Sequence, residues 1–230
     1  MFAILYFLAS FLYIIGYGGY LGAQYGAQGE MPDPAEIQAA VAAHLQTPAA
    51  IVGSYLVQFF LIIPVLLAVA NFKTQSLWST LAVRPFAIKL VWLWIGLLLV
   101  FLAAQSFLVR LLDVAPGEFM QMLAGSRHLP LVLVIVLVAP VLEELIFRGY
   151  LFTAWRQSRL GLTGTLLLTS ALFALMHWGQ YHWVQAVFIF ILALMLGIAR
   201  EKSGSVLLPM LLHALNNLAS AIVVIYLGIL

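Results

Sequence analysis

The sequence predicts an all-α fold, a polytopic membrane bundle of about seven (seven to eight) transmembrane helices. The first observation is composition: of 230 residues, 65% are hydrophobic and 8% charged, with a mean hydropathy of +1.11, whereas soluble domains carry about 25% charged residues. The second is that apolar runs approaching the roughly 20 residues needed to cross a bilayer recur along the whole chain. The third is that basic residues gather at alternate connections between these runs.

Seven segments are expected to cross the membrane, namely 2–23, 49–71, 86–109, 129–152, 163–177, 183–199 and 205–228. The first segment has no basic region before it and no small-residue cleavage site after it, so we expect a retained span. Its GYGGYLG stretch is expected to pack closely against another helix through small residues. The amphipathic stretches 34–46 and 116–125 are expected to lie on the membrane surface, and either could supply an eighth element.

The distribution of basic residues predicts the orientation. The connections after the second, fourth and sixth spans carry most of them: Lys73, Arg84, Lys89, Arg156, Arg159, Arg200 and Lys202. The opposite side has only Arg110 and Arg127, and its first loop carries Glu30, Asp33 and Glu36 without Lys or Arg. The positive-inside rule therefore predicts a multi-pass protein of the plasma or inner membrane with a cytoplasmic amino terminus and an external carboxyl terminus.

Composition also limits the chemistry. The chain has no cysteine, so disulfides, thiolate metal ligands and a cysteine nucleophile are excluded. The net charge of +2 is too small to indicate a nucleic-acid partner. We expect a single membrane domain in which residues 1–128 form about three spans with surface loops and residues 129–230 form a core of four spans. The expected partners are membrane lipid and a peptide or protein substrate; the sequence does not specify the oligomeric state.

The segment EELIFRG places Glu143, Glu144 and Arg148 inside the fourth span. Each charge at membrane depth costs about 3 kcal/mol on insertion scales, which makes such residues functional candidates. Glu144 and Arg148 stand at i and i+4, so they can neutralise each other as a purely structural pair. Glu143 points about 100° away around the helix and has Phe147 at i+4, so its partner is expected on another helix.

Two histidines on later spans are candidates for that partner. His177 shares a helix face with Phe173, and His213 shares one with Asn217. Glu143 and His177 both lie 17 residues from Leu160, where their spans are joined, which places both about 25 Å from the turn. His213 follows Gly204 by nine residues and is expected to be shallower unless its helix tilts or starts late.

These side chains together suggest hydrolysis. A carboxylate and an imidazole can activate a water as a general base, here Glu143 with His177. His213 and Asn217 can donate hydrogen bonds to an oxyanion that forms on a carbonyl. Two prolines, Pro140 before Glu143 and Pro209 before His213, are expected to kink their helices and open a cavity for water.

Other interpretations of the same residues stay open. Each histidine alone can be a packed core residue. Two histidines with one or two glutamates could bind zinc, although the spacing is not H-E-x-x-H and Asn217 is a poor zinc ligand. The chain could be a non-catalytic membrane scaffold or regulator, or a transporter that relays protons through Glu143 and His177, although the sequence shows no repeat between its halves.

Three motifs occur in order on successive spans: E-E-x-x-x-R from Glu143, F-x-x-x-H from Phe173, and H-x-x-x-N from His213. In this respect residues 129 to about 220 resemble the CPBP family of CAAX prenyl proteases type II and bacteriocin-processing (Abi) proteins, also described as intramembrane glutamic proteases.

The resemblance implies a metal-independent endopeptidase without a cofactor. It implies that Glu143 and His177 activate water, that His213 and Asn217 form the oxyanion site, and that supporting roles fall to Glu144, Arg148 and Phe173. Family members cleave prenylated CAAX proteins, mature bacterial peptides, confer bacteriocin immunity or regulate sensor kinases without proteolysis, so several substrate classes are implied.

The remaining polar and aromatic residues have structural interpretations. His44 and His128, in outer connections, are expected to be solvated. An aromatic cluster at a short turn is expected to anchor the chain at the membrane interface; it comprises Trp178, Tyr181, His182 and Trp183, of which His182 is close enough to His177 to touch the site. Gly149 is expected to let a neighbouring helix approach.

Overall fold

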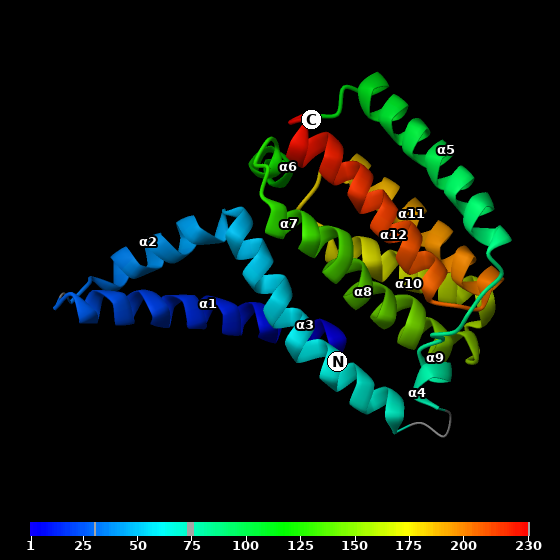
Figure 1. Ribbon diagram of the computed structural model, residues 1–230, viewed down its shortest axis with the longest axis horizontal. Coiled ribbons are helices and arrows are strands. Elements are labelled where there is room, and N and C mark those ends of the chain that lie inside the picture. The colour runs from blue at the N-terminus through cyan, green and yellow to red at the C-terminus, as the bar shows by residue number, and fades with distance from the viewer. Residues whose placement is uncertain (30, 73–75, 230) are drawn as a thin grey trace.

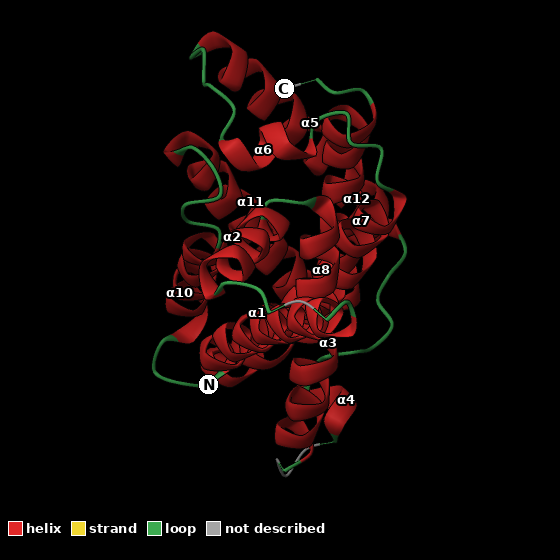
Figure 2. Cartoon of the chain, turned by 90° about the vertical axis from the view of Figure 1, so that its left-hand side faces the viewer, coloured by secondary structure: helices red, strands yellow, loops and turns green. Residues whose placement is uncertain are grey.

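The computed structural model describes residues 1–29, 31–72 and 76–229, so Glu30 and Lys73, on which part of the predicted orientation rests, lie outside the described residues. Within these ranges the chain forms helices and loops, without a β-strand (Figure 2). The α-helices are α1 (Phe2–Ala27), α2 (Pro34–Leu45), α3 (Pro48–Asn71), α4 (Leu77–Thr80), α5 (Lys89–Leu111), α6 (Glu118–Leu123), α7 (Leu129–Leu133), α8 (Ala139–Glu144), α9 (Phe152–Arg156), α10 (Gly161–Met176), α11 (Trp183–Ser203) and α12 (Leu207–Ser220). The π-helical segments are η1 (Val134–Val138), η2 (Leu145–Leu151) and η3 (Ala221–Tyr226).

The predicted helical membrane bundle is confirmed. Six helices in the described ranges are long and apolar enough to cross a membrane, and α10 is a shorter apolar helix. These seven elements coincide with the seven expected spans to within a few residues at most ends. The two amphipathic stretches form α2 and α6, with 12 and 6 residues, which are too short to cross a bilayer.

The helices form a central group flanked by two outlying parts (Figure 1). The group contains α8, α10, α11 and α12; α1 and α2 extend from it on one side, and α5 runs along the other. Large apolar side chains on the outlying helices are exposed, for example Phe7 at 75%, Phe11 at 58% and Trp92 at 73%. Exposed apolar surface on this scale is typical of a lipid-facing protein, as expected of a multi-pass integral membrane protein.

The fourth span, Leu129–Arg156, changes its winding around the buried Pro140. In η1 the Ala139 N–H bonds Val134 O, five residues back. The next bond of this kind would require an N–H from Pro140, which proline lacks, so Ile135 O is left without that partner. Nδ2 of Asn217 donates to Ile135 O at 2.9 Å. The π-helical segments on either side of α8 thus accompany the proline and place α8, with both glutamates, between them.

Pro209 does not fulfil the expectation of a kink. It occupies the third position of α12, which begins at Leu207. The N–H groups of the first helical turn have no intrahelical acceptor, so a proline there removes no hydrogen bond.

The expected close packing of GYGGYLG is also wrong within the chain. A Cβ added at Gly16, Gly19 or Gly22 would meet no atom within 4 Å, and one at Gly18 would meet only Val41, at 3.8 Å. Gly16, Gly19 and Gly22 meet no neighbour because α1 leaves the central group (Figure 1). At Gly149, in contrast, an added Cβ would lie 3.2 Å from Leu81 O. Another segment therefore does approach closely there, but it is the loop after α4 and not the expected helix.

Two histidines predicted to be solvated make defined contacts. His44 lies between tyrosines of α1: its Nε2 is 2.8 Å from Tyr13 Oη, and its ring stacks on that of Tyr17 at 3.6 Å between centroids. Nδ1 of His128 accepts from the Leu131 N–H at 3.2 Å and caps α7. Both are half-buried, because the connections that carry them fold back on neighbouring helices.

Candidate active site

Two carboxylates and a guanidinium are buried on the fourth span. Glu143 is 6% exposed, and Glu144 and Arg148 are 0% exposed. Nη1 of Arg148 donates to Glu144 Oε1 at 2.8 Å, and its Nη2 donates to Ala193 O at 2.9 Å. The predicted pairing of Glu144 with Arg148 is therefore confirmed. A buried carboxylate requires such a partner, since an isolated charge there is strongly unfavourable.

His213, on α12, reaches both carboxylates. Its Nδ1 lies 2.9 Å from Glu144 Oε1, and its Nε2 lies 3.8 Å from Glu143 Oε2. The expectation of a shallower His213 is thus wrong. The reason is the α11–α12 turn: Nε of Arg200, near the end of α11, donates to Arg148 O at 3.0 Å. Arg200, four residues before Gly204, thus lies beside Arg148, which precedes Leu160 by 12 residues, so the two turns are not level.

His177 is the C-terminal cap of α10. Its Nδ1 lies 2.8 Å from Phe173 O. A carbonyl oxygen only accepts, so Nδ1 carries the hydrogen, and in the neutral ring Nε2 keeps its lone pair. By the same argument Nδ1 of His213 donates to the carboxylate of Glu144. In both histidines, Nδ1 is used by the protein and Nε2 remains for chemistry.

The ring of Phe173 packs against His177, His213 and Arg148. The ring centroid lies 4.8 Å from that of His177 and 5.7 Å, edge-on, from that of His213. On another side, Cζ of Arg148 lies 4.7 Å from the centroid, within the range of a cation–π contact. Phe173 is 2% exposed, and it thereby separates the buried ion pair from the space beside the histidines.

A cavity of about 190 Å³ brings the predicted site residues together: Glu143, His177, His213 and Asn217 all line it. Asn217, which satisfies Ile135 O, comes from α12 one turn after His213. The direct polar contacts of Glu143 are with Tyr55 Oη, at 3.3 Å, and with His213. Glu143 and His177 therefore share the cavity and have no hydrogen bond to each other.

Two tyrosines of the cavity are not among the predicted site residues. Tyr55 comes from α3, a span without a recognised motif, and donates to Glu143. Tyr181, expected at the membrane interface, lines the cavity instead, because Gly179 (φ 87°) permits a tight turn that returns the chain. Burial, with the charge of Glu143, raises the pKa of Tyr181 to about 12, so its hydroxyl is a donor at neutral pH.

The other members of the aromatic cluster differ among themselves. Trp178 and Trp183 are 68% and 63% exposed, as interface anchors require. His182 caps α11: its Nδ1 accepts from the Val184 N–H at 3.4 Å, and its own N–H donates to Gln185 Oε1 at 3.2 Å. Its side chain therefore serves the helix end, whereas Gln185 lines the cavity.

For a metal, the described part of the chain offers no group of three or more histidine, aspartate or glutamate side chains arranged to hold an ion. The Glu144 oxygen nearest to His213 is also the one bonded to Arg148. A guanidinium at this oxygen competes with a cation for the same lone pairs.

Comparison with known proteins gives one family and one relative. Residues 125–219 match the family described as type II CAAX prenyl endopeptidase Rce1-like, and this stretch contains all four proposed catalytic residues. A protein of Escherichia coli described as an uncharacterized 24.3 kDa protein is 34% identical over 128 residues. The similarity covers 53% of this chain and 58% of that relative. No solved structure matches significantly. Residues 125–219 of this multi-pass membrane protein are thus similar to the Rce1-like family of type II CAAX prenyl endopeptidases.

Proposed function

We propose that this protein is an intramembrane endopeptidase of the glutamic type, which hydrolyses a peptide bond with a water activated by Glu143 and His177. One observation carries the proposal: the candidate base pair and the candidate oxyanion donors, from three different spans, line the same cavity of about 190 Å³. The similarity of residues 125–219 to the Rce1-like family supports a CAAX-type protease.

The acid–base step uses two acceptors. The carboxylate of Glu143 and Nε2 of His177 can each accept one hydrogen of a water between them. As the water oxygen attacks the substrate carbonyl carbon, one proton moves to this pair. The pair then returns a proton to the departing amine nitrogen, the C–N bond breaks, and a carboxylic acid and an amine are released. The Nδ1 bond to Phe173 O keeps the basic nitrogen of His177 toward the cavity.

The oxyanion step uses donors. Nδ2 of Asn217 has two hydrogens, of which Ile135 O takes one, so the second is available to the substrate oxygen. His213 can donate from Nε2 when both ring nitrogens carry protons, since Glu144 accepts the one on Nδ1. A preorganised donor of this type typically contributes about 10²–10³ in kcat.

The substrate is proposed to be a peptide or protein segment, with or without a lipid modification. The family description names prenylated CAAX substrates, and an unmodified bacterial peptide is the second class to compare. The alternatives are a zinc-dependent protease and a non-catalytic scaffold, for example a regulator of a sensor kinase or of bacteriocin immunity.

The test uses the purified full chain, a farnesylated CAAX peptide and a bacterial leader peptide, each with and without a chelator. We expect cleavage of at least one peptide, unaffected by the chelator. Glu143→Gln and His177→Ala are expected to lower kcat at least a hundredfold, or about 3 kcal/mol, without loss of folded protein. Glu118→Gln, in the exposed first turn of α6, is the matched control.

Two results would contradict the proposal. Cleavage that stops with the chelator and returns with Zn²⁺ would support the zinc-dependent alternative. A folded protein that cleaves neither peptide, with a cellular phenotype that survives Glu143→Gln, would support the scaffold.

A further inference from the structure

A second cavity, of about 410 Å³, lies at the end of the bundle where α9 and α11 end. The α4–α5 connection closes it on one side. Six of its lining residues matter here: Ser79, Arg84, Thr153, Arg156, Arg200 and Glu201. None of them takes part in the proposed proteolytic site, and the inference that follows does not depend on that activity.

The charge around this cavity is unbalanced. Among the described residues that line it, three are arginines and one, Glu201, is acidic. That carboxylate is already used: Nε and Nη2 of Arg156 donate to Glu201 Oε1 at 3.1 and 3.0 Å. Arg84 and Arg200 therefore face the same space without an ion pair of their own within the described chain.

Arg200 is held rigidly and forms no ion pair within the described residues. It is 7% exposed. Its Nε donates to Arg148 O at 3.0 Å, its Nη2 donates to Thr153 Oγ1 at 3.2 Å, and its Cζ lies 5.5 Å from the ring centroid of Phe152. All three partners are neutral, and Nη1 has no hydrogen bond within the described residues. A buried cation without a counter-charge is costly, so a site of this kind favours an anion.

Arg84 is exposed, but its position is fixed by the turn between α11 and α12. Its Nε donates to Gly204 O, and its carbonyl accepts from Ser205 Oγ at 2.6 Å. Gly204 has a φ of 67°, and a Cβ there would lie 3.0 Å from Nη2 of Arg84, so both the turn and the guanidinium require glycine. The outer nitrogens of Arg84 remain available to a ligand.

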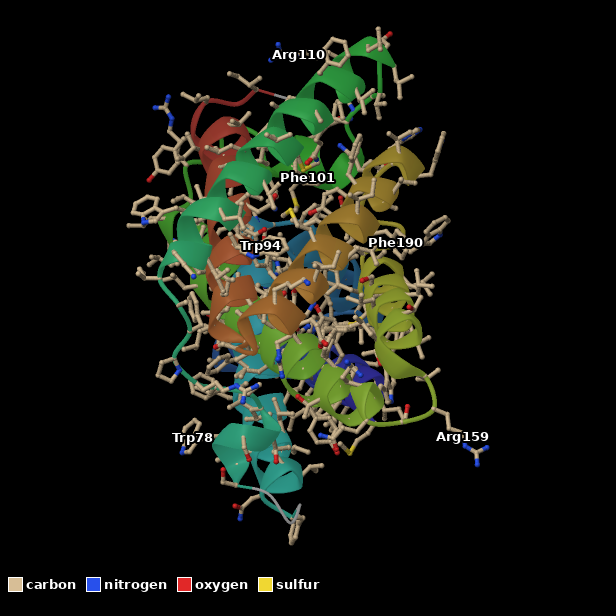
Figure 3. The ribbon with its side chains drawn as sticks, turned by 90° about the vertical axis from the view of Figure 1, so that its right-hand side faces the viewer. Trp78, Trp94, Phe101, Arg110, Arg159 and Phe190 are labelled. Carbon is tan, nitrogen blue, oxygen red and sulfur yellow. The ribbon has the colours of Figure 1, made fainter. Side chains whose placement is uncertain are left out.

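The cavity lies at the level of the membrane surface. It is bounded by Arg156 and Glu201, at the ends of two membrane-spanning helices. Trp78 and Arg159 project at the same end of the molecule, opposite to Arg110 (Figure 3), and tryptophan beside basic residues is typical of the lipid headgroup region. Basic pockets between membrane helices at this depth bind phosphorylated headgroups.

We propose that this cavity binds a phosphate group, held by the guanidiniums of Arg84 and Arg200 with Arg156 at its edge. Guanidinium presents paired N–H donors that match phosphate oxygens. An anionic lipid headgroup and free phosphate share this chemistry. Thr153, whose Oγ1 accepts from Arg200, keeps a hydroxyl hydrogen at the wall for the rest of a headgroup.

The first experiment separates the two sources. The full chain is released from micelles in native mass spectrometry after incubation with phosphatidylglycerol, or with phosphatidylcholine of the same acyl chains. A parallel sample in phosphatidylcholine nanodiscs receives inorganic phosphate, and its melting temperature is measured. Preferential retention of phosphatidylglycerol assigns the site to a lipid. A phosphate-dependent rise in melting temperature that Arg84→Gln abolishes assigns it to free phosphate. If neither effect is observed, the proposal is overturned.

Variants test the residues in both directions. Arg84→Gln is expected to lower the affinity for the bound species about tenfold, the effect of one charge-assisted hydrogen bond. Glu201→Gln removes the acid and frees Arg156, so it is expected to raise the affinity severalfold. Arg159→Gln, at the same end but outside the cavity, is the control. Equal affinities for the wild type, Arg84→Gln and Glu201→Gln would refute the site even where the protein binds lipid elsewhere.

Discussion

Nδ1 of His213 and Nη1 of Arg148 both donate to the same oxygen, Oε1 of Glu144, at 2.9 and 2.8 Å. One carboxylate oxygen thus joins a buried ion pair to a histidine that lines the cavity. Glu144 therefore does more than neutralise Arg148: it also holds the ring of His213, with Nε2 toward Glu143. The sequence motif implies a supporting role for Glu144, and this geometry shows what that role would be in physical terms.

Replacement of Glu144 should damage both stability and activity. Glu144→Gln leaves Arg148 buried without its hydrogen-bonded counter-charge, and removal of one partner of a buried pair costs about 3–5 kcal/mol. We expect that loss in the free energy of unfolding, measured by SDS titration, together with a lower kcat. The double variant Glu144→Gln/Arg148→Met should recover part of the stability but not the activity. A single variant as stable as the wild type would show that the ion pair is not needed.

Replacement of Asn217 should separate a structural bond from a catalytic one. Asn217→Leu leaves Ile135 O, in the π-helical segment, without its donor, which should cost about 1–3 kcal/mol. If Asn217 also binds the oxyanion, kcat should fall by about 10²–10³, far more than the stability change explains at temperatures where the variant stays folded. A kcat that changes less than threefold would leave Asn217 with the structural bond alone.

Tyr55 provides a test of a residue outside the family domain. Tyr55→Phe removes one hydrogen bond to Glu143, at 3.3 Å, and leaves the ring in place. We expect a fall in kcat of about fivefold to tenfold, in line with about 1–1.5 kcal/mol for one such bond. Tyr25→Phe, at the far end of α1, is the control and should match the wild type. Equal kcat values for both variants would remove Tyr55 from the site.

Substitution of Gly149, with Gly96 as the control, tests how tightly the fourth span is packed. A Cβ at Gly149 would lie 3.2 Å from Leu81 O, a backbone atom that cannot move alone, whereas one at Gly96 meets nothing within 4 Å. Gly149→Ala should therefore destabilise the protein by about 1–3 kcal/mol. Gly96→Ala, inside α5, should be neutral or stabilising by up to about 1 kcal/mol. Unfolding curves of the two variants in one detergent decide this, and a Gly149→Ala protein as stable as the wild type would be the contrary result.

The parts of the fold that depend on local pattern could be predicted from the sequence. The lengths of apolar runs identified the spans, and the i, i+4 spacing identified the pair of Glu144 and Arg148. The depth of His213 could not be predicted, because it is set by a bond between Arg200 and a main-chain oxygen 52 residues away. Turn positions counted along the chain contain no such information.

The rest of the cavity escaped prediction for a related reason. Tyr55 and Tyr181 carry no motif, and a lone tyrosine in an apolar span or near an interface is compatible with several surroundings. Tyr55 lies three residues before the buried Gln58, and this pairing of polar side chains within a span is the signal that could have marked α3. The bond from Asn217 to Ile135 O depends on π-helical winding before Pro140, which no residue pattern indicates.

The two histidines differ in how they can be dissected genetically. The acceptor for Nδ1 of His213 is a side chain, so substitution of Glu144 changes the tautomer partner without touching the ring. The acceptor for Nδ1 of His177 is the main-chain carbonyl of Phe173, which every residue at position 173 retains. Substitution of another residue, Glu144, can therefore alter the hydrogen bond that fixes the tautomer of His213. No amino-acid substitution removes the main-chain acceptor of His177. Replacement of that peptide bond by an ester would weaken this acceptor.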